Sequence, residues 1–386
     1  MIDGKISLLF LSWRDIRSPK SGGAEVHTHG LLSHLDSTKY QVVHFSPLYE
    51  GMELYEKIDG VDYYRRGNVF SVVWYARRYY QEHKCDIDYV VDQCNTHHFF
   101  TGLWVKKEKR IFYIHQLTRE IWDINMGFPV GMIMRHLETP MLRLQRNDYV
   151  ITVSESTKQD LLDVGFHSDR IFIIPNAIPF DLLGLQIDDE IMGKHHDFIY
   201  VGRYSKYKGI DAAISAIGLA RKKYPDIRLR IVGKKDEDIV DSVIRPLAEQ
   251  YGLSIGDDDN GDNDIVLLGY VSERVKHELM SRSLALVFPS IREGWGIIVS
   301  EAAAVGTPSI VYDSPGCRDA VDYGRCGYIC NENTTEALAK RMIACIYDRD
   351  EYMQIRKAAY DFVQNMTWEN NIRRFDDMMD RIRSNG

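Results

Sequence analysis

The sequence lacks the features of a secreted or membrane-spanning protein. No apolar run approaches the roughly 18 residues that a transmembrane helix needs. The first residues predict a buried strand rather than a signal peptide, because Arg14 and Asp15 follow the apolar run at once. The six cysteines form no CxxC pair, which favours reduced thiols over a disulfide framework. We therefore expect a cytoplasmic protein, with peripheral attachment to the inner membrane face as an open alternative.

A basic charge balance is also missing. The chain has 48 Lys and Arg against 56 Asp and Glu, a net charge of -8. Nucleic-acid binding needs a dense basic face that neutralises phosphates, so nucleic acid is not an expected partner. At 386 residues, 45% of them hydrophobic, the chain is long enough for two domains with sizeable cores.

Short apolar runs rich in β-branched and aromatic residues recur through both halves, with helical stretches between them. This alternation predicts an α/β protein built from two doubly wound, Rossmann-like domains with parallel sheets. The expected strands are Ile6 to Leu11, Gln41 to Phe45, Tyr89 to Val91, Arg110 to Ile114, Tyr149 to Val153, Asp197 to Val201, Arg228 to Val232, Ile265 to Leu268, Leu284 to Phe288 and Ser309 to Tyr312.

The domain boundary is expected near Pro175 and Pro179, since two prolines disfavour a continued helix or central strand. The domains are then residues 1–180 and 181–367. A closing helix over about 368–386, with Phe375 and Met379 on its apolar face, is expected to pack back on the first domain. The Asp- and Gly-rich segment 252–264 does not fit a calcium-loop spacing and is expected to be a solvated loop.

The first candidate site is the glycine pair Gly22 and Gly23. It follows the first strand and opens a helical pattern that includes Val26. Paired glycines let backbone N–H groups approach an anion at the positive end of a helix, although an ordinary turn is the alternative. The spacing is not the dinucleotide fingerprint, which disfavours an NAD site.

The second candidate follows the strand that ends at Gly202. Arg203 and Lys208 lie five residues apart on a strand-to-helix loop. Two cations at this place suit a diphosphate, because each can bridge a phosphate and stabilise charge on a leaving group. A solvated basic loop is the alternative.

The third candidate is a glycine-bracketed loop that joins a strand to a helix. Glu293 is expected in the loop, and Glu301 about one turn into the helix. One carboxylate can hold sugar hydroxyls while the other meets a ribose, and the helix start can receive phosphate. The loop residues between the two carboxylates are Gly294, Trp295, Gly296, Ile297 and Ile298.

These residues together resemble glycosyltransferase family 4, also called glycosyl transferases group 1. Glu293 and Glu301 lie within Pro-Ser-x-x-Glu-Gly-Trp-Gly and Glu-Ala-x-x-x-Gly-Thr-Pro, which is similar to the signature of that family. Supporting motifs follow in the expected order over nearly the whole chain: Gly22-Gly23, Val153-Ser154-Glu155-Ser156, Ile174-Pro175-Asn176-Ala177, Val201-Gly202-Arg203, Lys208-Gly209, Gly269-Tyr270-Val271 and Gly324-Arg325-Cys326-Gly327.

The resemblance implies a GT-B fold, with two Rossmann-like domains facing across a cleft, and a retaining reaction that needs no metal or other cofactor. In that scheme Arg203 and Lys208 neutralise the diphosphate of a nucleotide-sugar donor, Glu293 contacts the donor sugar, and Glu301 binds the ribose. Gly22 and Gly23 complete the phosphate site when the domains close. His115 resembles the family's histidine near the reacting sugar, with a structural histidine as the alternative. The other expected donor-binding positions are Gly202, Gly233, Val271 and the loop from Gly294 to Ile298.

The expected function is transfer of a hexose from a nucleotide diphosphate sugar to a glycan or lipid-linked acceptor. A nucleotide-sugar epimerase of the same architecture and a non-catalytic sugar-nucleotide binding module are the alternatives. Basic and apolar residues mix between Trp104 and Arg146, a composition that could contact an anionic membrane. The alternatives for this segment are helix cores or a dimer contact.

Overall fold

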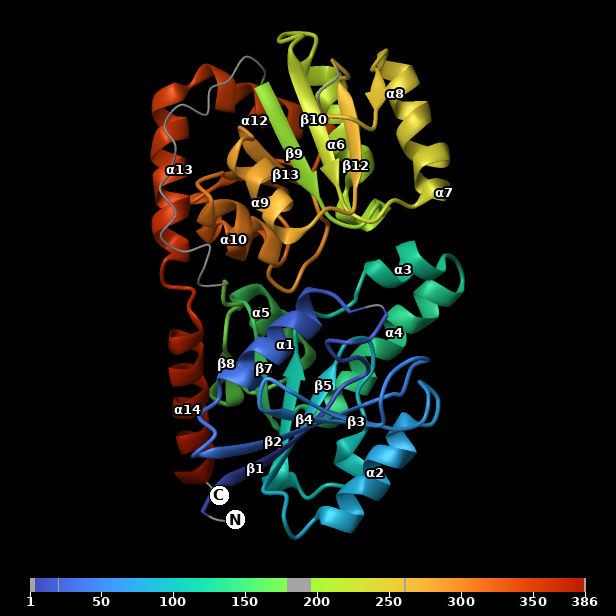
Figure 1. Cartoon of the computed structure of the whole chain (residues 1–386), viewed down its shortest axis with the longest axis vertical. Helices are drawn as coiled ribbons and strands as arrows, with labels where there is room; N and C mark the ends of the chain where they lie inside the picture. Colours follow the sequence, from blue (N-terminus) through green and yellow to red (C-terminus); the bar gives the residue numbers. More distant parts are fainter. Residues whose placement is uncertain (1–3, 20, 179–195, 260–261, 385–386) are drawn as a thin grey trace. The chain divides into compact units, whose positions relative to one another are not determined.

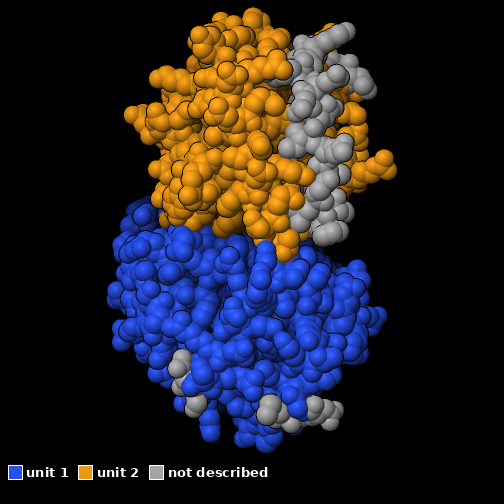
Figure 2. Space-filling model, turned by 90° about the vertical axis from the view of Figure 1, so that its left-hand side faces the viewer, with its two compact units in different colours: residues 1–177, 368–386 blue, residues 178–367 orange. Residues whose placement is uncertain are grey.

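The chain forms two compact units. A computed structural model describes residues 4–19, 21–178, 196–259 and 262–384. Unit 1 contains residues 1–177 and 368–386, and unit 2 contains residues 178–367 (Figure 2). The expected boundary at residues 180 and 181 lies outside the described residues. Within the described ranges, no helix has the length and hydropathy needed to cross a bilayer.

Unit 1 is built on an eight-stranded sheet with the order β3-β4-β2-β1-β5-β6-β7-β8 (Figure 1). All six residues of the central strand β1 are buried, as expected for a parallel strand covered on both faces. Its strands are β1 (Ile6–Leu11), β2 (Tyr40–Ser46), β3 (Tyr55–Ile58), β4 (Val61–Arg65), β5 (Tyr89–Cys94), β6 (Arg110–Ile114), β7 (Tyr149–Thr152) and β8 (Ile171–Ile173). Its helices are α1 (Gly23–His34), α2 (Val72–His83), α3 (Ile121–Met126), α4 (Val130–Leu142), α5 (Glu155–Val164) and α14 (Trp368–Ser384).

One pair of strands departs from the parallel pattern that the sequence predicts. β3 and β4 form an antiparallel hairpin at the edge of the sheet. Its turn residues, Asp59 and Gly60, have φ of 47° and 86°. An Asp-Gly pair between two short strands is the signal for this type of turn, because both positions need a positive φ.

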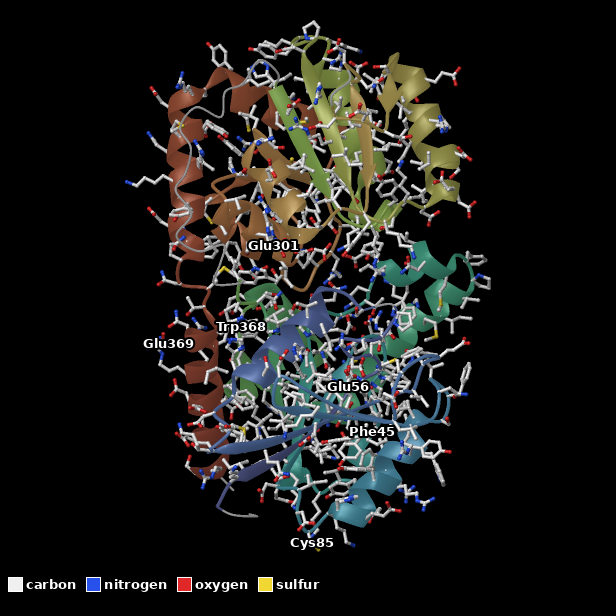
Figure 3. The ribbon with its side chains drawn as sticks, in the orientation of Figure 1. Phe45, Glu56, Cys85, Glu301, Trp368 and Glu369 are labelled. Carbon is white, nitrogen blue, oxygen red and sulfur yellow. The ribbon has the colours of Figure 1, made fainter. Side chains whose placement is uncertain are left out.

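Helix α14 returns the chain to unit 1 and packs against α1. The indole ring of Trp368 lies so close to Gly30 that a Cβ atom there would be 2.2 Å away. The rings of His27 and His34 stack on the same indole at centroid distances of 5.5 and 5.1 Å. Figure 3 labels this tryptophan, Trp368, at the start of α14. The Asn371 amide donates to the Pro175 carbonyl over 2.6 Å, which joins α14 to the end of the first stretch of unit 1.

Unit 2 contains a seven-stranded parallel sheet with the order β11-β12-β10-β9-β13-β14-β15. The first strand, β9, lies at the centre, and the chain builds outward to one side before it crosses to β13 on the other side. The strands are β9 (His196–Val201), β10 (Ile227–Val232), β11 (Ile255–Gly256), β12 (Ile265–Gly269), β13 (Ala285–Phe288), β14 (Ser309–Val311) and β15 (Tyr328–Ile329). The helices are α6 (Ile210–Ala220), α7 (Glu237–Ile239), α8 (Arg245–Tyr251), α9 (Glu273–Ser281), α10 (Ile297–Ala304), α11 (Cys317–Ala320), α12 (Thr335–Tyr347) and α13 (Arg349–Val363).

Two features of unit 2 bear on its boundaries and its stability. The ends of the unit lie side by side, because the Ile178 N–H donates to the Met366 carbonyl over 2.8 Å. The acidic segment expected to be a solvated loop instead supplies ion pairs to the sheet. The Asp259 carboxylate lies 3.1 Å from Arg228 and 2.6 Å from Arg230, two arginines that are almost fully buried. Asp197 of β9 pairs with the same two arginines over 2.9 and 2.7 Å, so the loop adds a second carboxylate to an ion-pair network on the sheet.

Candidate active site

The strongest candidate site lies where the strand order of unit 2 reverses. β9 and β13 are neighbours, and the loops that follow them meet at the carboxyl edge of the sheet. The Ile291 N–H donates to the Tyr207 carbonyl over 3.1 Å and ties the loops together. Gly209, with φ of 74°, lies against Pro289 so closely that a Cβ atom would be 2.3 Å from the Pro289 carbonyl oxygen. Ligands of doubly wound sheets bind at this switch point.

The two loops bring Lys208 and Glu293 into contact. The Lys208 ammonium lies 2.5 Å from the Glu293 carboxylate, which also accepts a 2.6 Å hydrogen bond from the Ser290 hydroxyl. Burial works against the charged ammonium, but the Glu293 carboxylate outweighs it and raises the pKa of Lys208. The pair is held at the switch point and is largely withdrawn from water, with the Lys208 and Glu293 side chains 17% and 11% exposed. Arg203 lies on the same loop, but its side chain is exposed and does not join the pair.

The helix after the Glu293 loop presents its N-terminus at the same edge. Gly296 caps α10 with φ of 87°, a conformation that favours glycine, and Ile297 begins the helix. The indole N–H of Trp295 donates to the Ser300 hydroxyl over 2.9 Å and fixes the loop on the first turns. Gly294, Gly296, Ile297 and Ile298 thus surround a helix start of the kind that binds phosphate.

Glu301 lies in α10 and is paired with a helix that sequence reasoning missed. Figure 3 labels Glu301. The Lys276 ammonium from α9 lies 2.6 Å from the Glu301 carboxylate, and the His277 ring nitrogen lies 3.6 Å away. Burial raises the pKa of Glu301, but hydrogen bonding to His277 and the Lys276 charge outweigh it, so the net pKa is lowered. Glu273, Lys276 and His277 are three and four residues apart on α9, so their shared face was visible in the sequence. Their proximity to Glu301 was not.

The same residues form the one group with metal-like donors in the described ranges. Donor atoms of Glu273, His277 and Glu301 lie within 4.8 Å of one another. The Lys276 ammonium lies 2.6 Å from both carboxylates and supplies the positive charge between them. The cluster therefore has the geometry of an ion network in which one ammonium is shared by two carboxylates.

Three glycines at the ends of adjacent strands form the floor of the candidate site. The Gly202 N–H donates to the Val232 carbonyl over 3.0 Å, and the Gly233 N–H donates to the Gly269 carbonyl over 2.9 Å. A Cβ atom on Gly233 would be 1.9 Å from the Gly202 carbonyl oxygen, so a side chain cannot be accommodated there. Val271 follows Gly269 and is half-buried.

In unit 1 the glycine pair lies at the start of α1, but a carboxylate already occupies one of its amides. The Gly22 N–H donates to Glu25 over 2.8 Å, and the Glu25 carboxylate also lies 3.0 Å from Arg14 and from the Asn95 amide. Gly23 and Ala24 lie in the first turn of α1, where backbone N–H groups have no carbonyl acceptor within the helix. The helix expected after the glycine pair is present as α1, with Val26 53% exposed and Leu32 buried.

His115 follows β6 and lies among other aromatic side chains of unit 1. Burial and the nearby His27 ring lower the pKa of His115 to about 3. Its Nε2 lies 3.3 Å from the Gln93 amide nitrogen, and its ring centroid is 5.8 Å from that of His27. Burial also lowers the pKa of His27 to about 4. Both imidazoles are therefore neutral near pH 7.

Each of the two units matches a model of a known glycosyltransferase family. A family model described as "Glycosyltransferase Family 4" matches residues 21–182, and one described as "Glycosyl transferases group 1" matches residues 188–362. The chain belongs to glycosyltransferase family 4. The predicted family and enzyme class are thereby confirmed, and the two matches together include the candidate residues of both units.

Curated relatives agree with this assignment. An uncharacterized glycosyltransferase of Haemophilus influenzae is 29% identical over 212 residues, 54% of each chain, so the match spans about half of that relative. An uncharacterized glycosyltransferase of Methanocaldococcus jannaschii, MJ1607, is 24% identical over 90% of this chain and 92% of its own.

Solved structures confirm the predicted GT-B fold of this glycosyltransferase. Sucrose-phosphate synthase from Thermosynechococcus elongatus superposes with a TM-score of 0.79 at 16% identity, over 99% of this chain and all of its own. Anabaena HepE, solved in complex with UDP and glucose, gives a TM-score of 0.70 at 16% identity, over 97% of this chain and all of its own. At these identities the likeness defines the fold alone.

Proposed function

We propose that this glycosyltransferase is a retaining, metal-independent hexosyltransferase. It moves a hexose from a nucleotide diphosphate sugar to a glycan or lipid-linked acceptor. The observation that carries the proposal is the buried Lys208 and Glu293 pair at the switch point of unit 2. The UDP and glucose bound to Anabaena HepE, a protein of the same fold, support the donor class.

Four charged residues at the candidate site of unit 2, Arg203, Lys208, Glu293 and Glu301, each have a role in this scheme. The Lys208 ammonium meets the diphosphate, the amides at the start of α10 receive a phosphate oxygen, and Arg203 adds charge from the exposed part of its loop. Glu293 accepts a hydroxyl of the donor sugar, and Glu301 accepts a hydroxyl of the ribose. Positive charge placed before the reaction stabilises the leaving diphosphate as it develops negative charge.

Retention follows from attack on the face that the diphosphate leaves. The bond between the anomeric carbon and the diphosphate oxygen breaks, and the acceptor oxygen bonds to the same face of the carbon. The acceptor's proton goes to the departing phosphate oxygen, so no carboxylate nucleophile is required. His115, neutral because of its lowered pKa, offers a hydrogen bond to a sugar hydroxyl without adding charge. In this scheme the backbone N–H groups at the start of α1, beside Gly22 and Gly23, also bind donor phosphate.

Metal independence has an electrostatic basis in the same residues. Lys208, the N-terminus of α10 and Arg203 supply the positive charge that a divalent ion supplies in other transferases. The reaction is placed in the cytoplasm, and a lipid-linked acceptor would bring the enzyme to a membrane surface by peripheral contact.

A panel of nucleotide sugars tests this function. Each donor is scored by thermal shift and by release of nucleotide diphosphate, with and without EDTA, using wild type and Glu293→Gln. We expect release from one donor class, unchanged by EDTA and lost in the variant. Release abolished by EDTA would refute metal independence. Thermal stabilisation without release, even with acceptors added, would favour the epimerase if the sugar isomerises, and a binding module if it does not.

A further inference from the structure

Helix α4 of unit 1 turns an apolar face to the solvent. Val130, Ile133 and Leu137 are spaced three and four residues apart, and their side chains are 50%, 51% and 46% exposed. Leu144, just beyond the helix, continues the same stripe at 56% exposure. Residues at this spacing share one side of a helix, so they form a continuous apolar stripe.

The opposite side of α4 buries the one acidic residue of the helix. The Glu138 carboxylate accepts the N–H groups of Thr118 and Arg119 over 2.5 and 2.9 Å. The Arg119 guanidinium also donates to the Thr139 hydroxyl over 3.1 Å. The polar side of α4 is therefore committed to holding the loop that leads from His115 to α3.

The turn between α3 and α4 extends the exposed stripe. Phe128 at its tip is 86% exposed, and Ile124, Met126 and Met132 are 43 to 51% exposed. Residues 124–137 thus expose seven large apolar side chains on one hairpin. An apolar cluster of this density on a monomer marks an interaction surface.

The charges around this hairpin select its partner. The exposed charged residues between positions 124 and 147 are Arg135, Arg143 and Arg146, and the one carboxylate of that stretch, Glu138, is 6% exposed. Arg135 lies 2.8 Å from Asp123 at the base of the hairpin. A self-complementary contact between two copies would oppose the arginines to one another. Anionic lipid headgroups instead match arginines that flank apolar side chains.

We infer that the α3 to α4 hairpin is a membrane-docking element that inserts its apolar side chains into an anionic lipid surface. Phe128 and the α4 stripe enter the boundary between headgroups and acyl chains, while the arginines contact lipid phosphates. The docking element rests on the proposed transfer reaction, and it identifies the acceptor of that reaction as lipid-linked. The loop that Glu138 holds joins this hairpin to His115 within unit 1, which places an acceptor headgroup near that histidine.

Vesicle flotation with the full chain tests the docking element. The vesicles are phosphatidylcholine with and without phosphatidylglycerol, and the variant is Phe128→Gln, Ile133→Gln, Leu137→Gln combined. Since each position is exposed, the variant should keep the melting temperature of wild type. We expect wild type to bind the anionic vesicles, more weakly in high salt, and the variant to bind them about tenfold less or weaker still. Tyr347→Gln, at a 77% exposed position of unit 2, is the matched control and should bind like wild type.

Two outcomes would overturn the inference. In the first, wild type stays in the lipid-free fraction, or the triple variant floats with the vesicles as well as wild type does. The other is a dimer in light scattering that the triple variant dissolves, because the hairpin would then be a contact between copies. Donor-induced thermal shift without vesicles separates this test from the proposed function: the triple variant should keep it. Vesicle binding with no response to any donor would refute the transferase proposal and leave the docking element standing.

Discussion

The two units place their candidate residues in opposite electrostatic states. In unit 2 the candidate groups are charged and paired, Lys208 with Glu293 and Lys276 with Glu301. In unit 1 the candidate His115 is half-buried and its neighbour His27 is buried, and both are neutral near pH 7, with pKa values lowered to about 3 and 4. The contrast fits a division of labour, because a donor diphosphate needs fixed charge while acceptor hydroxyls need neutral hydrogen-bonding groups.

Removing the charge of Glu293 should break this contrast most strongly. We expect Glu293→Gln to lower the transfer rate about 10²- to 10³-fold. Lys208 loses its ion-pair partner, and the donor sugar loses a negatively charged hydrogen-bond acceptor. Donor affinity should fall much less. Rates and donor binding by calorimetry would show this, with exposed Glu332→Gln as the control. Near-normal transfer by this variant would show that the reaction does not require the Glu293 carboxylate.

Acid should reveal the neutral state of unit 1. The folded pKa of His27 lies below its usual 6.5, so the unfolded chain binds the proton more tightly. Its contribution to stability is present above pH 6.5 and is lost as the pH falls towards 4, by up to about 3 kcal/mol. The free energy of unfolding should therefore fall less steeply over this window in His27→Gln than in wild type. The exposed His167→Gln should leave the slope unchanged, and equal slopes in all three proteins would show that His27 titrates normally.

The smallest effect is expected at the second charged pair of unit 2. Lys276→Met leaves the half-buried Glu301 without its ammonium partner, which should raise the carboxyl pKa and weaken the hydrogen bond that we propose it makes to a ribose. We expect the dissociation constant of the nucleotide diphosphate to rise about tenfold, with little change in the rate at saturating donor. Titration calorimetry measures this, and the exposed Lys340→Met is the control. An unchanged dissociation constant would argue that Glu301 is structural.

Much of the fold could be predicted from periodicity and turn residues. The strands Ile6–Leu11 and Arg110–Ile114 have the predicted bounds, because fully buried parallel strands read as continuous apolar runs. The β3 to β4 hairpin was missed although Asp59 and Gly60 signal it, since both strands are short and no residue of β3 is buried. The Asp59-Gly60 turn shows that a hairpin signal is easily missed when the strands beside it are short.

The candidate site shows a different limit. The spacing of Glu293 and Glu301 lies within one loop and helix, so it could be read directly from the sequence. The partners of these residues could not. Lys276 reaches Glu301 through the packing of α9 on α10, and Glu25 occupies the Gly22 amide that the sequence left for a phosphate. Side-chain pairs between elements depend on tertiary packing, which no spacing encodes.

The adjacency of Ile178 and Met366 has a consequence for modularity. Unit 2 enters and leaves at one point, so it is an uninterrupted insertion within unit 1, whose own ends meet through Asn371 and Pro175. Such a topology lets one module be exchanged at two neighbouring junctions without rethreading the other. A related chain could thus exchange residues 178–367 for another module while unit 1, with the terminal helix that completes it, stays intact.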